Sequence, residues 1–97
     1  MPGSKDPIEL TNEILLDGTF VTNVIRALPA TTRKIRSVLV QADPNNGADI
    51  FVGNATSQSV QLIPGGVWRA DIDNPVKIYV RPAAGTQRVN WQAVGGV

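Results

Sequence analysis

The stretch Val67-Trp68-Arg69-Ala70-Asp71-Ile72-Asp73 alternates between apolar and charged side chains from its second residue onward. Successive side chains of a β-strand point to opposite faces of the sheet. The apolar members therefore share one face and the charged members the other, as in a strand with one buried and one solvated face. We predict a strand over 67–73, with its apolar face toward the core formed by Trp68, Ala70 and Ile72.

Working outward from this stretch, the chain contains further short segments rich in Val, Ile, Thr and aromatic residues, which favour a pleated surface. Turn-forming Gly, Pro, Asn and Asp separate these segments at intervals of roughly 8–12 residues. No connection has the length and helical pattern of a parallel crossover. With 67–73, the expected strands are 19–25, 35–42, 49–53, 60–63, 77–80 and 89–93. About seven short strands at this spacing predict an all-β fold, an antiparallel β-sandwich or a jelly-roll-like barrel.

A length of 97 residues corresponds to one domain. Residues 1–16 are expected to form an extended N-terminal arm, because Pro2, Gly3 and Pro7 disfavour a helix there. Residues 17–97 are expected to form the β-sandwich domain. No apolar run approaches the roughly 20 residues of a membrane helix, and the first residues lack the pattern of a secretory signal. We therefore expect synthesis in the cytoplasm and no membrane partner.

The composition argues against catalysis and cofactor binding. The chain has no histidine and no cysteine, which removes the commonest general base and the commonest metal ligands. Its serines lie in no nucleophile-elbow pattern, and its glycines form no phosphate-binding loop. A net charge of +1 gives no reason to expect direct nucleic-acid binding. The sequence thus predicts a non-enzymatic protein without cofactor or metal.

Two charged groups have both a functional and a structural interpretation. Asp71 and Asp73 share one face of the predicted strand, which suits a calcium or paired-carboxylate site. The stronger interpretation is structural: a solvated strand face whose charges are matched by Arg69 or Lys77. The only basic cluster, formed by Arg33, Lys34 and Arg36, indicates either a solvated strand entry or an electrostatic contact with an acidic protein surface.

Trp68 and Trp91 lie on the apolar faces of two alternating segments. A small sandwich with only five aromatic residues needs large side chains in its core, so core packing is one interpretation. A tryptophan on a sheet face can instead stack on a sugar or anchor an interface. The second interpretation would make the protein a carbohydrate-binding module.

From residue 38 onward, an ordered set of short pieces resembles a class of small virion proteins of tailed bacteriophages. The pieces are VLVQADP (38–44), DIFVG (49–53), LIPG (62–65), ADIDN (70–74), KIYV (77–80) and VNW (89–91). The resemblance covers about the last 60 residues, whereas the first 30 do not match the pattern.

This resemblance implies a structural part of a phage particle located at the capsid surface. It favours a capsid decoration (cement) protein that binds the major capsid protein or other virion proteins and stabilises the head. Such proteins commonly occupy symmetry positions, so a homo-oligomer is expected, with a trimer as the predicted form. A tail, fibre or baseplate accessory protein is the alternative. An extended arm can add a strand to a neighbour's sheet, so the expected partner-binding residues are Ile8, Leu10, Ile14, Leu15, Arg33, Lys34 and Arg36.

Overall fold

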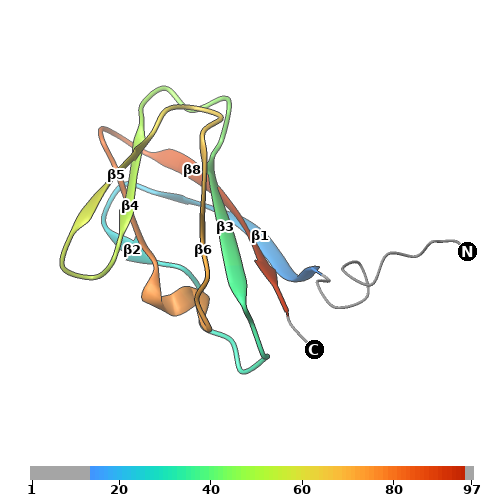
Figure 1. The fold of residues 1–97 in the computed structure, drawn as a ribbon. Helices are drawn as coiled ribbons and strands as arrows, with labels where there is room; N and C mark the ends of the chain where they lie inside the picture. Colours follow the sequence, from blue (N-terminus) through green and yellow to red (C-terminus); the bar gives the residue numbers. More distant parts are fainter. Residues whose placement is uncertain (1–13, 96–97) are drawn as a thin grey trace, which may run out of the picture.

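The computed structural model describes residues 14–95 and contains eight β-strands and one short 3-10 helix (Figure 1). The strands are β1 (Ile14–Thr22), β2 (Arg26–Ala27), β3 (Ser37–Ala42), β4 (Ile50–Gly53), β5 (Gln58–Leu62), β6 (Val67–Ala70), β7 (Tyr79–Pro82) and β8 (Gln87–Val94). The 3-10 helix η1 (Pro75–Lys77) precedes β7. The predicted all-β class is confirmed.

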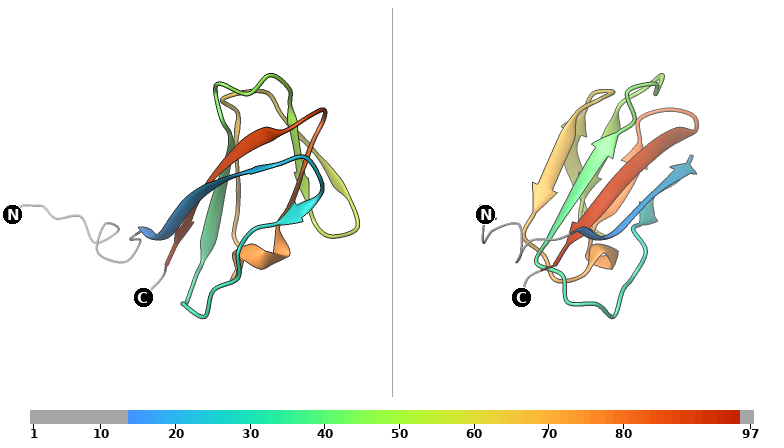
Figure 2. Two further views of the ribbon diagram at one scale, coloured as in Figure 1. Left: turned by 180° about the vertical axis from the view of Figure 1, so that it is seen from behind. Right: turned by 90° about the vertical axis from the view of Figure 1, so that its right-hand side faces the viewer.

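The strands form two antiparallel four-stranded sheets, which face each other in Figure 2. Their orders are β1-β8-β3-β6 and β2-β7-β4-β5. The first strand therefore pairs with the eighth, the second with the seventh, the third with the sixth and the fourth with the fifth. The two halves of the chain thus run antiparallel to each other like one long hairpin wrapped into two layers. Eight strands arranged in this way form a jelly roll.

The core lies between the sheets and consists mainly of aliphatic side chains of moderate size. On β3, Val38, Val40 and Ala42 are fully buried, and on the facing sheet Ile50, Val52 and Val80 are fully buried as well. Large aliphatic residues outside the strands close the core, among them Leu28 and Ile78, each 1% exposed. The alternation of buried and more exposed residues along β8 matches the two-residue period of a strand with one face in the core.

One close approach across the first sheet involves the largest core side chain. Trp91, on β8, is 7% exposed and pairs with Gly18 on β1. A Cβ atom placed on Gly18 would lie 3.0 Å from the indole Nε1 and 3.2 Å from Cε2 and Cζ2 of Trp91. Gly18 therefore gives the indole the space in which it lies against β1.

The first predicted strand differs from the structure. Instead of one strand over 19–25, β1 ends at Thr22 and a separate two-residue strand, β2, begins at Arg26. The side chain of Thr22 causes the break, because its hydroxyl accepts a hydrogen bond from the Val24 N–H and donates one to the Val24 carbonyl. This local turn sends the chain into the second sheet. The expected boundary between arm and domain at residue 16 falls inside β1, which begins at Ile14.

The predicted strand over 67–73 also ends early. Only residues 67–70 pair with β3, and the chain then leaves the sheet. Asn74 caps η1 through its side chain, which accepts a hydrogen bond from the Val76 N–H. Because η1 extends to Lys77, the strand expected at 77–80 lies instead at Tyr79–Pro82.

Candidate partner-binding surface

The basic cluster predicted from the sequence lies in the connection between β2 and β3, residues 28–36. This connection is anchored by two buried side chains, Leu28 and Ile35, which are 1% and 7% exposed. Its backbone is also held at both ends, because the Leu28 N–H donates to the Ile78 carbonyl (3.0 Å) and the Arg36 N–H donates to the Val94 carbonyl (2.9 Å). The exposed side chain of Arg33 thus projects from a fixed loop.

Asn74 links this connection to the one between β6 and β7. Its side-chain amide donates to the Thr31 carbonyl (2.8 Å) and accepts from the Thr31 N–H (3.3 Å). These are main-chain contacts of the basic loop, so they fix its path without using the side chains of Arg33 and Lys34. The two connections therefore form one surface at this end of the sandwich.

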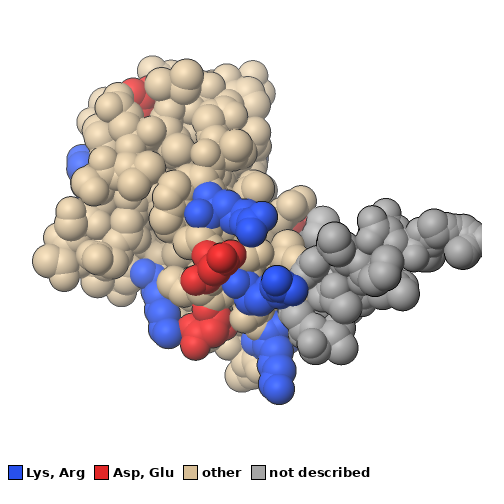
Figure 3. Space-filling model, in the orientation of Figure 1, with Lys and Arg blue, Asp and Glu red and all other residues tan. Residues whose placement is uncertain are grey.

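We call this surface the basic end. Figure 3 shows charged side chains gathered there, whereas the opposite end of the same face is mostly uncharged. Five of the charged side chains at the basic end are basic and two are acidic, whereas the whole sequence carries a net charge of +1. The residues of the basic end are Arg33, Lys34, Arg36, Arg69, Asp71, Asp73 and Lys77.

The two aspartates of the predicted acidic pair each have a basic neighbour. The Asp71 carboxylate lies 3.5 Å from the Arg69 guanidinium, and that of Asp73 lies 2.7 Å from Nζ of Lys77. The hydrogen bond from Lys77 and its positive charge lower the pKa of Asp73. Within residues 14–95, no group of three or more metal-ligating His, Cys, Asp or Glu side chains occurs. The structural interpretation of this pair, a solvated surface with matched charges, agrees with these contacts.

Arg69 and Lys77 match the charges of the two aspartates, so the unmatched positive charge of the basic end comes from Arg33 and Lys34 in the β2–β3 loop. Arg33 and Lys34 are exposed and form no ion pair with any residue in the described part of the chain. Exposed cations on a fixed loop steer the approach of an acidic surface and strengthen its encounter complex.

The start of β1 lies at the same end of the molecule. Ser37, which directly follows the basic cluster, pairs with Val94 on β8, and Val94 also pairs with Ile14. The predicted arm residues Ile8 and Leu10 lie outside the described residues. Ile14 and Leu15 belong to the backbone of β1, and their side chains lie outside the description as well. The fold thus places the origin of the N-terminal segment beside the basic cluster.

The side chains of both tryptophans contribute to the core between the sheets. Trp91 is buried, and Trp68 is half-buried and packs against the same core. Trp91 therefore presents no open ring face on the sheet surface, and Trp68 is partly exposed while it packs against the core. The carbohydrate-binding module predicted from Trp68 or Trp91 therefore loses Trp91 as its stacking surface.

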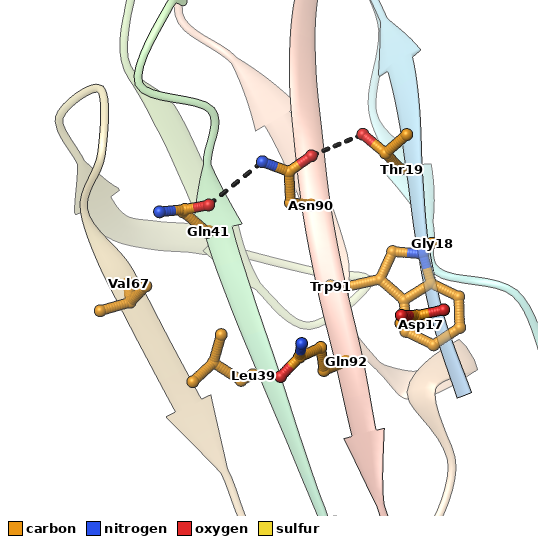
Figure 4. Close-up of a pocket in the computed structure, with 9 residues that line it drawn as sticks. All are labelled: Asp17, Gly18, Thr19, Leu39, Gln41, Val67, Asn90, Trp91 and Gln92. Carbon is orange, nitrogen blue, oxygen red and sulfur yellow. Dashed lines mark hydrogen bonds between the residues drawn. The ribbon is translucent and has the colours of Figure 1, made fainter. Parts of the chain in front are cut away.

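A groove that no sequence pattern indicated lies on the outer face of the sheet that contains β1 and β8. The groove has a volume of about 410 Å³ and is open to solvent (Figure 4). Cross-strand pairing brings its polar lining together from three strands, so no short motif could have indicated it. The side chains on this face are those of Asp17, Thr19, Leu39, Gln41, Val67, Asn90 and Gln92.

Within the described residues, no helix has the length and apolar character required to cross a membrane. In comparisons with known proteins, the chain matches no protein-family model and no curated protein.

Proposed function

We propose that this protein is a non-enzymatic structural component of a tailed-bacteriophage particle, a capsid decoration protein that binds the major capsid protein through its basic end. In this role it adds to the outer surface of the assembled head and stabilises it. An oligomer, with three copies around a symmetry position, is part of the proposal.

The observation that carries the proposal is the convergence of two separate segments at one end of the sandwich. The basic loop and the start of β1 are distant in sequence, yet the pairing of Ser37, Val94 and Ile14 brings them together. On this surface, a fixed cationic loop lies beside the point where the residues before Ile14 join β1. Such a surface suits attachment to a larger assembly. The loop supplies electrostatic attraction, and the segment can add main-chain hydrogen bonds to a neighbour's sheet.

The fold and the sequence give further support. Jelly rolls occur in viral capsid domains, although a fold by itself does not determine a function. The ordered pieces from residue 38 onward resemble tailed-phage virion proteins, and the sequence lacks histidine and cysteine. These features favour assembly over catalysis.

The test is co-sedimentation of the purified protein with undecorated heads of the phage that encodes it. We expect saturable binding that weakens as salt rises, because salt screens exposed charges. The double variant Arg33→Glu/Lys34→Glu should lose most of this binding. Arg88→Glu is the control for a single charge reversal away from the basic end, since Arg88 is exposed but lies in β8 near the opposite end.

Electron microscopy of the complex then locates the bound protein. Density on the head shell, lost in the double variant and kept in the control, supports the proposal. Absence of binding to heads, or density on the tail or baseplate instead, contradicts it. The second result would favour the tail accessory protein.

A further inference from the structure

The groove on the outer face of the first sheet is formed by two rows of cross-strand neighbours. In one row, Asn90 on β8 pairs with Thr19 on one side and with Gln41 on the other. In the adjacent row, Gln92 pairs with Asp17 and with Leu39 in the same manner. Three side-chain amides, a hydroxyl and a carboxylate thus face the same open space (Figure 4).

We propose that this groove is a binding site for an uncharged oligosaccharide. A side-chain amide offers both donors and acceptors, and a carboxylate accepts two or more hydrogen bonds, which suits neighbouring sugar hydroxyls. The apolar side chains of Leu39 and Val67, the latter 57% exposed, can contact the C–H face of a sugar ring. The volume of about 410 Å³ falls within the range of small-ligand sites.

The first row is ordered by its own hydrogen bonds. The Thr19 hydroxyl donates to Oδ1 of Asn90, and Nδ2 of Asn90 donates to Oε1 of Gln41 and to Oδ2 of Asp43, each at 3.1 Å. This network holds the amide of Asn90 in one orientation. A ligand therefore meets polar groups that are already positioned, which lowers the entropic cost of binding.

The second row supplies the free hydrogen-bonding groups. Within residues 14–95, the side chains of Asp17 and Gln92 form no hydrogen bond or ion pair. Both point into the groove next to the ordered row. They can therefore bind sugar hydroxyls without breaking an existing contact.

Two features favour a sugar over a peptide or an anion. The main chains of β8 and β3 are paired on both sides, so a peptide cannot bind them by strand addition, which needs a free edge. Among residues 14–95, Asp17 is the only charged residue that lines the groove, and its negative charge repels anionic ligands. Hydroxyl groups are neutral and match the amide lining.

This site lies on a sheet face and uses none of the residues of the basic end. The inference therefore goes beyond the proposed docking function. A variant that loses sugar binding should still attach to phage heads, and a variant that loses attachment should still bind the sugar. Each proposal can therefore be refuted without refuting the other.

The test is a titration of ¹⁵N-labelled protein followed by NMR. The probes are neutral hexasaccharides of three kinds, a β-1,4-glucan, an α-1,4-glucan and chitohexaose, with an uncharged Gly-Ser hexapeptide for comparison. We expect at least one sugar to shift the side-chain amide signals of Gln41, Asn90 and Gln92 at millimolar concentration. None of the exposed side chains that line the groove is aromatic, so no ring can stack on the sugar. We therefore expect the affinity for the sugar to be weak.

Variants separate groove binding from nonspecific contact. Gln92→Ala should weaken binding about fivefold, the factor for one neutral hydrogen bond, and Asp17→Asn should weaken it as well. Gln61→Ala, a glutamine exposed on β5 in the other sheet, is the matched control and should leave binding unchanged. No shift with any sugar, shifts that persist unchanged in Gln92→Ala, or shifts with the peptide alone would each overturn the inference.

Discussion

The packing of Trp91 against Gly18 leads to a specific prediction for Gly18→Ala. The added methyl group would lie 3.0–3.2 Å from three atoms of the indole, closer than an unstrained carbon contact. Overpacking of this kind costs about 1–3 kcal/mol. Gly18 does not have a positive φ, so alanine fits its backbone and restricts the unfolded chain, which stabilises by about 0.4–1 kcal/mol. The steric cost exceeds this gain, so we expect a net loss of about 1–2 kcal/mol in the free energy of unfolding.

Urea denaturation followed by circular dichroism measures this loss, and a double-mutant cycle assigns it to the indole. In a Trp91→Phe background, Gly18→Ala should be tolerated better, because the smaller ring leaves room for the methyl group. Gly47→Ala is the control, since nothing lies within 4 Å of a Cβ at Gly47. This control should be neutral or slightly stabilising. If Gly18→Ala were as stable as the natural protein, or equally costly in both backgrounds, the packing argument would be refuted.

Three further predictions concern the link between loops, the charges and the core. Asn74→Ala removes the cap of η1 and both contacts to the β2–β3 loop, so it should lower the free energy of unfolding by about 1–2 kcal/mol; an unchanged urea midpoint would contradict the linking role. Because Lys77 lowers the pKa of Asp73, the charged form of Asp73 favours the folded state at pH above its unfolded pKa, and this contribution disappears as pH falls through its folded pKa. In an NMR titration, Lys77→Ala should raise the pKa of Asp73 toward its ordinary value and leave that of Asp43 unchanged; a constant Asp73 pKa would argue against the contact in solution. Ile50→Ala creates a cavity between the sheets and should cost about 2–5 kcal/mol, whereas a loss below about 1 kcal/mol would show that the core closes around the gap.

The sequence predicted those parts of the fold that depend on local pattern. The alternation around Trp68 and Ala70 correctly indicated a strand with one face toward the core, although that face is only partly buried. The turn residues between segments indicated an antiparallel arrangement. The end of that strand at Ala70 was not predictable, because it depends on where the pairing with β3 stops and on the cap formed by Asn74. β2 has only two residues and therefore has no detectable periodicity.

The candidate sites were predictable to different degrees. The basic cluster is contiguous in sequence, so Arg33, Lys34 and Arg36 were visible at once, whereas their position beside the start of β1 depends on strand order. The groove requires the register of distant strands, since Asn90 lies 71 residues from Thr19 and 49 residues from Gln41. Sequence patterns report the period within a strand and do not report which strands become neighbours.

The pairing of the first strand with the last has a consequence for how the protein is made. Thr19 emerges from the ribosome 71 residues before its neighbour Asn90. At a synthesis rate of about 5–20 residues per second, β1 stays without the partner it has in the folded sheet for several seconds. Only after residues 87–94 have been synthesised can β8 enter between β1 and β3 and complete the sheet. This sheet can therefore be completed only after β8 has been synthesised, and a chain cut short before residue 87 would leave β1 as an unpaired strand able to join another polypeptide.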